Sequence, residues 1–165
     1  MGWHQIRRDK VDILFSRYIR LRDKGRCVYT GCTYKGTGIE GITGLDASHF
    51  KSRGCENTRF DPENVDSFCR SHHKYLGEHR TEYEDFKLKQ LGTTRYDLLC
   101  VRAVTYVKRD RAMAYIVVKE LMKTLKRKPI YCKKCKEAFG FTISSLKIMP
   151  WGLIKEFEDR HKNCV

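Results

Sequence analysis

Two sets of paired cysteine and histidine residues constrain the fold of this 165-residue chain more than any other feature. In the first set, Cys27 and Cys32 are separated by residues 33–68 from Cys69 and His72. Two thiolates from one turn, with a thiolate and an imidazole from a second turn, match the ligands of a tetrahedral structural zinc site. The sequence therefore predicts a fold in which zinc supplies much of the folding free energy of a segment that is poor in apolar residues.

The second set lies near the end of the sequence, where Cys132 and Cys135 precede His161 and Cys164. Both pairs have the spacing of zinc ligands, although the distance between the pairs exceeds that of the common Cys2His2 finger. We predict a Cys3His zinc-finger-like module over residues 129–165. Its many lysines suit contact with a DNA backbone, and dimerisation or packing is the alternative role.

The composition favours a nucleic-acid partner. Lys and Arg total 34 against 20 Asp and Glu, which gives a net charge of +14, and such an excess attracts polyanions. No apolar run approaches the ~20 residues that span a bilayer, and the N-terminus is too polar for a signal peptide. We therefore expect a cytoplasmic protein with no membrane partner, in which cysteines bind metal. Cys55 and Cys100, outside both sets, are expected to be buried apolar groups or surface thiols.

Apolar periodicity predicts helices around the first cysteine set. Residues 9–22 form an amphipathic pattern whose basic face includes Arg17 and Arg20 as candidate phosphate contacts. Residues 81–91 continue as helix up to Gly92, and residues 111–127 give the clearest helix, which suits either the core or a dimer interface. The sequence further predicts a strand over 42–50 and a short strand or turn leading into a helix over 65–77.

Between the first zinc pairs, four ordered motifs resemble a known family. They are Ser-His-Phe at 48–50, Ser-Arg-Gly at 52–54, Thr-Arg-Phe-Asp-Pro-Glu-Asn at 58–64 and Cys-x2-His-His at 69–73. These motifs are similar to those of HNH (ββα-metal) endonucleases, most of all the NinG/Rap group of phage recombination nucleases and related prophage HNH proteins. The resemblance covers about residues 12–92. It implies a DNA endonuclease of the host-cell cytoplasm, acting on branched recombination intermediates such as Holliday junctions.

The resemblance also implies residue roles. His49 would be the general base that activates water, because an imidazole can accept a proton at neutral pH. Asn64 would orient His49 across the loop, and His73 would bind a catalytic Mg²⁺ or Mn²⁺ ion. The spacing alone leaves open whether His72 or His73 completes the structural zinc site. Three further residues are candidate DNA contacts: Lys51, Arg53 and Arg59.

The acidic metal ligand that many HNH enzymes place directly before the base is absent, because Ser48 stands there. Asp46 is the nearest acid, but on a regular strand its side chain would point away from His49. Either the strand is bulged, or the ion uses another group such as His79 or Glu82, or His49 itself binds the ion.

The predicted fold is α+β: a small zinc-stabilised ββα-metal core flanked by helices, with a C-terminal zinc module. The expected organisation is a basic amphipathic helix at 1–26, the nuclease core at 27–92, a helical segment at 93–128 and the zinc module at 129–165. Two alternatives remain open, a non-catalytic zinc-bound nucleic-acid-binding module and an RNase of the same fold. A homodimer is a further expectation, since resolving a four-way junction requires two cuts.

Overall fold

The computed structural model describes residues 8–125, 130–131 and 138–139, and it divides into two compact units, Met1–Leu125 and Lys126–Val165. In the second unit, β3 (Ile130–Tyr131) pairs antiparallel with β4 (Ala138–Phe139). The four predicted ligands of the C-terminal zinc module lie outside the described residues: Cys132, Cys135, His161 and Cys164.

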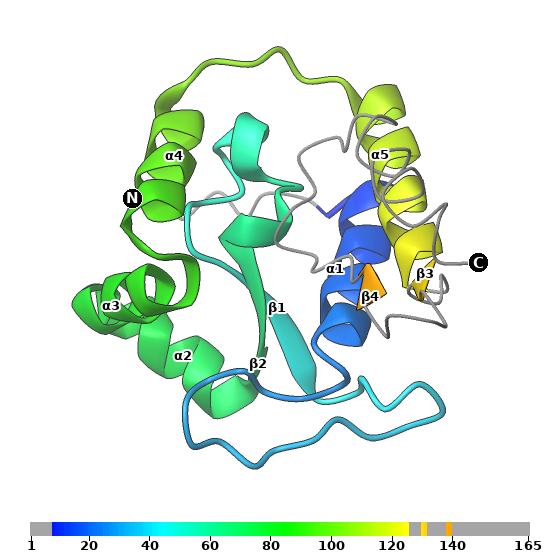
Figure 1. Cartoon of the computed structure of the whole chain (residues 1–165), viewed down its shortest axis with the longest axis vertical. Coiled ribbons are helices and arrows are strands. Elements are labelled where there is room, and N and C mark those ends of the chain that lie inside the picture. The colour runs from blue at the N-terminus through cyan, green and yellow to red at the C-terminus, as the bar shows by residue number, and fades with distance from the viewer. Residues whose placement is uncertain (1–7, 126–129, 132–137, 140–165) are drawn as a thin grey trace, which may run out of the picture. The chain divides into compact units, whose positions relative to one another are not determined.

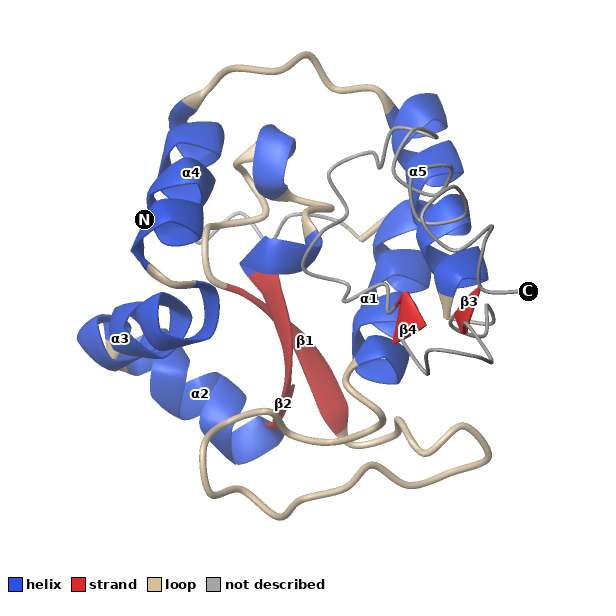
Figure 2. Ribbon diagram, viewed as in Figure 1, coloured by secondary structure: helices blue, strands red, loops and turns tan. Residues whose placement is uncertain are grey.

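The first unit is an α+β fold built on a two-stranded antiparallel sheet (Figures 1 and 2). Strand β1 (Leu45–His49) pairs with β2 (Val65–Cys69) in an unbroken register from Leu45–Cys69 to His49–Val65. The connection between the strands contains two short 3-10 helices, η1 (Glu56–Thr58) and η2 (Pro62–Asn64). Helix α2 (Arg70–Glu78) begins directly after β2, so Cys69 ends the strand and caps the helix.

Helix α1 (Lys10–Arg22) begins at a capping box. The Asp9 side chain accepts a hydrogen bond from the Asp12 backbone N–H, and the Asp12 side chain accepts one from the Asp9 backbone N–H,. Its apolar stripe packs against the sheet, and Phe15, Tyr18 and Ile19 are fully buried. The prediction of an amphipathic helix over 9–22 therefore agrees with the structure. The chain then turns sharply, with positive φ angles at Lys24 and Gly25.

Three helices complete the unit: α3 (Arg80–Leu91), α4 (Thr93–Val104) and α5 (Arg111–Thr124). Helix α3 packs on α2 and α4, whereas α5 packs on α1 at the other side of the sheet (Figure 1). In α5, Val118 and Leu121 are buried as the periodicity predicts, but Val117 is exposed. Within residues 93–125, the described part of the predicted helical segment at 93–128, the chain forms two helices joined by residues 105–110.

The core between the sheet and α3 is aromatic. Phe50 and Phe68 pack edge-on against Tyr83 with ring centroids 5.2 Å and 5.7 Å apart, and Phe86 joins Phe68 at 5.4 Å. Cys27, Cys69 and Leu76 belong to the same buried cluster. Among the described residues, no helix is both long and apolar enough to cross a membrane.

Candidate functional site

The first cysteine set converges on one point of the fold. The ligand atoms of Cys27, Cys32, Cys69 and His72 all lie within 4.8 Å of one another. His72 Nδ1 is 3.2 Å from Cys69 Sγ and 3.5 Å from Cys27 Sγ. This cluster could hold a tetrahedral metal ion such as zinc, and it contains His72 rather than His73.

Local backbone geometry explains why these four side chains meet. A turn closed by the Cys32 N–H on the Tyr29 carbonyl brings the first two thiols together, and the Val28 N–H bonds the Ser67 carbonyl to hold that turn on β2. Cys69 and His72 lie three residues apart at the start of α2, where side chains at i and i+3 are neighbours,. The Tyr29 ring stacks on the His72 ring at 4.3 Å and fixes its orientation.

The electrostatics of the cluster suit a cation. Burial, together with hydrogen bonding to the neighbouring thiols, raises the pKa of Cys27 to about 12. A thiolate is therefore unfavourable there without a positive charge, and a coordinated divalent cation deprotonates a thiol outright. The ligands present fit zinc, which prefers sulfur and imidazole nitrogen.

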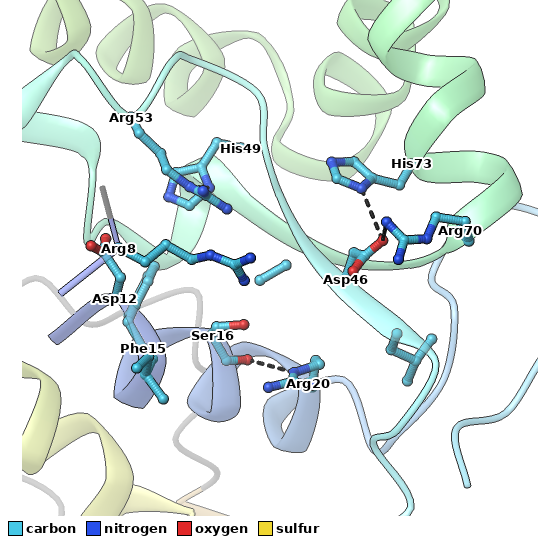
Figure 3. A pocket seen from close by; sticks show the side chains of 13 residues that line it. Arg8, Asp12, Phe15, Ser16, Arg20, Asp46, His49, Arg53, Arg70 and His73 are labelled. Atoms are coloured by element: carbon cyan, nitrogen blue, oxygen red, sulfur yellow. Dashed lines mark hydrogen bonds and ion pairs between the residues drawn. The ribbon is translucent and has the colours of Figure 1, made fainter. Parts of the chain in front are cut away.

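A separate pocket of about 270 Å³ lies between α1, β1 and the start of α2 (Figure 3). Asp46, His49 and His73 all line it. Four arginines line the same pocket: Arg8, Arg20, Arg53 and Arg70. The pocket thus combines candidate proton-transfer and metal-binding groups with a cationic wall suited to a phosphate.

His49 ends β1 with its ring in a defined orientation. Its Nε2 lies 3.0 Å from the Arg59 carbonyl, which can only accept a hydrogen bond, so Nε2 carries the proton and Nδ1 bears the lone pair,. The Nε of Arg53 lies 3.4 Å from that Nδ1. Burial, and then the charge of Arg53, lowers the pKa of His49 to about 4. The imidazole is therefore neutral at pH 7, with its lone pair covered by Arg53.

Asn64 closes the loop that carries the groups around His49. Its fully buried amide donates to the Lys51 and Thr58 carbonyls at 3.0 Å and 2.9 Å, and its Oδ1 accepts from the Lys51 N–H at 2.7 Å. The Asn64 carbonyl also accepts from the Phe50 N–H at 2.9 Å. These bonds fasten residues 50–64 back onto the end of β1.

Asp46 and His73 face each other across the pocket wall (Figure 3). The Asp46 Oδ2 lies 3.1 Å from His73 Nδ1 and 3.5 Å from Arg70 Nη1. The β1–β2 pairing is regular, so strand alternation puts Asp46 and His49 on opposite faces of β1, yet both residues line the same pocket,. A two-stranded ribbon twists more strongly than a wide sheet, so side chains from both faces can reach one pocket at its open edge.

The other two candidate ion ligands lie elsewhere. His79 and Glu82 are exposed, and neither lines the pocket. The His79 ring stacks on Tyr75 at 4.1 Å, and Glu82 lies 3.5 Å from the Tyr75 hydroxyl. Among the described residues, no group of three His, Cys, Asp or Glu side chains other than the Cys/His cluster converges to ligand distances.

The five predicted DNA contacts have different environments. Arg20 and Arg53 line the pocket, and Lys51 lies over the Phe50 ring at 4.6 Å. Arg17 is exposed and paired with Glu40 on the loop before β1. Arg59 is only 2% exposed, and its guanidinium binds both carboxylate oxygens of the buried Asp12. The prediction that Arg59 contacts DNA is therefore wrong, because an ion pair inside the protein holds the side chain.

Sequence reasoning missed two of the pocket arginines. Arg70 lies three residues before His73, so both fall on one face of α2, and helical spacing around His73 would have found it. Arg8 precedes the first helix and has no periodic or motif signal.

Comparisons with protein-family models, with curated proteins and with solved structures find no match for this chain. A neutral histidine whose Nδ1 lone pair lies under Arg53, an acid and a second histidine at ligand distance, and an arginine-rich wall together suit deprotonation of water beside a bound phosphate that engages Arg53,.

Proposed function

We propose that this protein is a metal-dependent DNA endonuclease of the HNH (ββα-metal) type, which hydrolyses phosphodiester bonds with His49 as the general base. The observation that carries the proposal is that Asp46, His49 and His73 line one arginine-rich pocket. That pocket lies on a strand pair and helix whose start is held by a Cys/His cluster. The motif resemblance falls on these same residues.

The Asp46 and His73 pair fits a catalytic divalent ion. One carboxylate oxygen and one imidazole nitrogen, 3.1 Å apart, leave most of an octahedral shell to water and to phosphate oxygens, as is usual for Mg²⁺,. The imidazole also suits Mn²⁺, Co²⁺ or Ni²⁺. Such an ion, when bound, stabilises charge on the phosphate and on the leaving oxygen.

His49 would accept the proton of the attacking water at Nδ1, because Nε2 already carries a proton and donates it to the Arg59 carbonyl. In the free protein Arg53 covers that lone pair. A phosphate entering the pocket offers Arg53 a better partner, since charge-assisted bonds to an anion are stronger than a bond to a neutral ring. Removing the cation from Nδ1 and adding a nearby anion both raise the pKa of His49 toward the working pH, which improves the base.

The net charge of +14 supports nucleic acid as the substrate, because phosphate contacts dominate such binding and carry no sequence information,. Branched recombination intermediates are the first DNA class to test, on the strength of the motif resemblance. A structural zinc ion in the Cys/His cluster would hold α2, and with it His73, against the strands.

The deciding experiment is cleavage of supercoiled plasmid and of a synthetic four-way junction in Mg²⁺, Mn²⁺ or EDTA. We expect metal-dependent cutting that falls by about 10²–10⁴-fold in His49→Ala, the usual range for a general base. DNA affinity measured in EDTA should be unchanged in that variant. His79→Ala is the matched control, because this exposed histidine lies outside the pocket and its loss should leave cleavage intact.

Two further results would redirect the proposal. Wild-type protein that binds DNA without cutting it in any ion would contradict the DNA endonuclease and favour a non-catalytic nucleic-acid module, unless RNA is cut in a parallel assay. The ion site is tested by Asp46→Asn, which removes a charged ligand. This variant should raise the half-saturating Mn²⁺ concentration for cleavage by about tenfold or more. Its bound zinc should equal that of the wild type.

A further inference from the structure

Helix α3 holds the backbone on both sides of His49. The Tyr83 hydroxyl donates to the Ser48 carbonyl at 3.1 Å, and Arg80 Nη2 donates to the Phe50 carbonyl at 2.8 Å. Ser48 and Phe50 are the immediate neighbours of His49. Two side chains one turn apart on a single helix therefore fix the two carbonyls that flank the proposed base.

The Tyr83 side chain is itself immobilised. It is 1% exposed, and its ring packs edge-on between Phe50 and Phe68. Burial, and then the nearby Asp66 carboxylate, raises the pKa of Tyr83 well above its usual value of 10. The hydroxyl is therefore a neutral donor with a fixed position.

The nearby Asp66 carboxylate does not compete strongly for that hydroxyl proton. Asp66 pairs with Ser48 across the strands, and its two oxygens are engaged by Lys87 Nζ and Gln90 Nε2, each at 2.8 Å. The Tyr83 hydroxyl lies 3.5 Å from Asp66 but only 3.1 Å from the Ser48 carbonyl. The Asp66–Lys87 pair is buried, so it ties β2 to α3 while Tyr83 ties α3 to β1.

Arg80 makes the second attachment from the edge of the core. Its guanidinium lies over the Phe50 ring at 5.2 Å and over the Tyr83 ring at 5.3 Å while bonding the Phe50 carbonyl. The planar cation is held by two ring faces, which restricts it to the geometry that reaches that carbonyl.

We propose that Tyr83 and Arg80 are positioning residues for His49. They hold the Ser48 and Phe50 carbonyls on either side of it. The His49 ring is thereby oriented with Nε2 on the Arg59 carbonyl and Nδ1 toward the pocket. The inference rests on the proposed function of His49, and it assigns to α3 a role outside the strand pair and α2. The physical reason is that a small displacement of a reacting group slows the reaction: a shift of about 1 Å can lower the rate by up to 10²-fold.

The kinetic test compares Tyr83→Phe with Tyr96→Phe in the full chain. The Tyr96 ring also lies against Phe50, but its hydroxyl is beside Cys100. Tyr83→Phe should lower kcat by about tenfold with KM within about twofold, whereas Tyr96→Phe should match wild type. Arg80→Gln should also lower kcat. Unchanged kcat in Tyr83→Phe overturns the proposal, and an effect of Arg80→Gln on KM alone would make Arg80 a DNA contact instead.

A second readout does not depend on cleavage. In protein labelled with ¹⁵N-histidine, wild-type His49 should give the signals of a neutral ring protonated at Nε2. In Tyr83→Phe, with a melting curve that confirms folding, the same residue should show a mixture of the two neutral forms. Identical His49 signals in both proteins would overturn the positioning role even if both cut DNA. If wild type cuts nothing, the proposed function fails, and the ¹⁵N spectra still decide whether α3 orients the ring.

Discussion

The Cys/His cluster contains His72 of α2, and the arginine-rich pocket contains His73 of the same helix. The side chains of the cluster already converge in the protein alone, whereas those of the pocket are paired with one another. In the cluster, four ligand atoms lie within 4.8 Å of one another. In the pocket, Arg53 covers the His49 lone pair and His73 is paired with Asp46. His72 and His73 are consecutive, yet a rotation of about 100° per helical residue sends one to each region.

Under the proposed function, this difference separates a site that needs only a metal ion from a site that also needs its substrate. Short side chains on turns and helix ends hold the cluster, so backbone geometry alone brings the thiols together. The pocket is lined by long arginines, which in the proposed function exchange partners when a phosphate binds. A structural site is therefore visible in the free protein, whereas the proposed catalytic arrangement is completed by the phosphate.

The largest expected effect comes from breaking the cluster. Cys69→Ser should remove the bound metal and unfold the region around β2 and α2, because structural zinc supplies about 10 kcal/mol or more of binding free energy, comparable with the ~5–15 kcal/mol stability of a whole domain. Metal content by atomic absorption and unfolding in urea measure it. Cys55→Ser, which changes a cysteine outside the cluster, should leave both unchanged. A folded Cys69→Ser protein would show that the two regions are independent.

A smaller effect is expected from the buried ion pair between Arg59 and Asp12, a residue that lines the pocket. Arg59→Met leaves the buried Asp12 carboxylate without its partner, and breaking a buried pair in this way costs about 3–5 kcal/mol,. Arg17→Met breaks the exposed pair with Glu40 and should cost less than about 1 kcal/mol,. Urea denaturation gives both values. Equal losses in the two variants would contradict the structural role given to Arg59, and loss of bound zinc in Arg59→Met would mean that the pocket also supports the cluster.

The smallest effect concerns acid stability. The folded-state pKa of His49 is about 4, against 6.5 for a free histidine. Between these values the unfolded chain binds a proton that the folded chain does not. Stability should therefore fall as the pH is lowered from about 6.5 toward 4, by at most about 1.4 kcal/mol per pH unit from this residue. No change from His49 is expected above this window.

The comparison for acid stability is with His49→Gln, which does not titrate but keeps a polar side chain. Loss of metal from the cluster at low pH is common to both proteins and cancels in the difference. Urea unfolding at several pH values from 7 to 5 should therefore show a steeper decline for wild type. Parallel curves would mean that His49 is solvated and that Arg53 does not cover it.

The sequence predicted the cluster better than the pocket, for a physical reason. Ligand spacing on a turn and at a helix start is local, so Cys69 could be paired with His72 or His73 before any tertiary structure was considered, and the structure places His72 in the cluster. The helices at 9–22, 81–91 and 111–127 were also predictable, because their apolar periodicity is a local property.

The pocket depends instead on contacts between distant segments. Strand alternation puts Asp46 and His49 on opposite faces of β1 and does not reveal that both line one pocket, because the rule does not include the twist and open edge of a two-stranded ribbon,. Arg59 stood in one of the motifs that carry the family resemblance, and only its pairing with Asp12 of α1 identifies it as a buried residue. The attachment of Tyr83 to Ser48 joins residues with no local relationship in the sequence.

The adjacency of His72 and His73 has a consequence for synthesis of the chain. A nascent polypeptide carries Cys27 and Cys32 early, but the remaining two ligands of the cluster only as α2 leaves the ribosome, and the histidine of the pocket follows by a single residue. Domains fold as units once their residues are available. Metal acquisition and assembly of the proposed active site are therefore interlocked in time: no stage of translation yields the pocket without the ligands that fasten it.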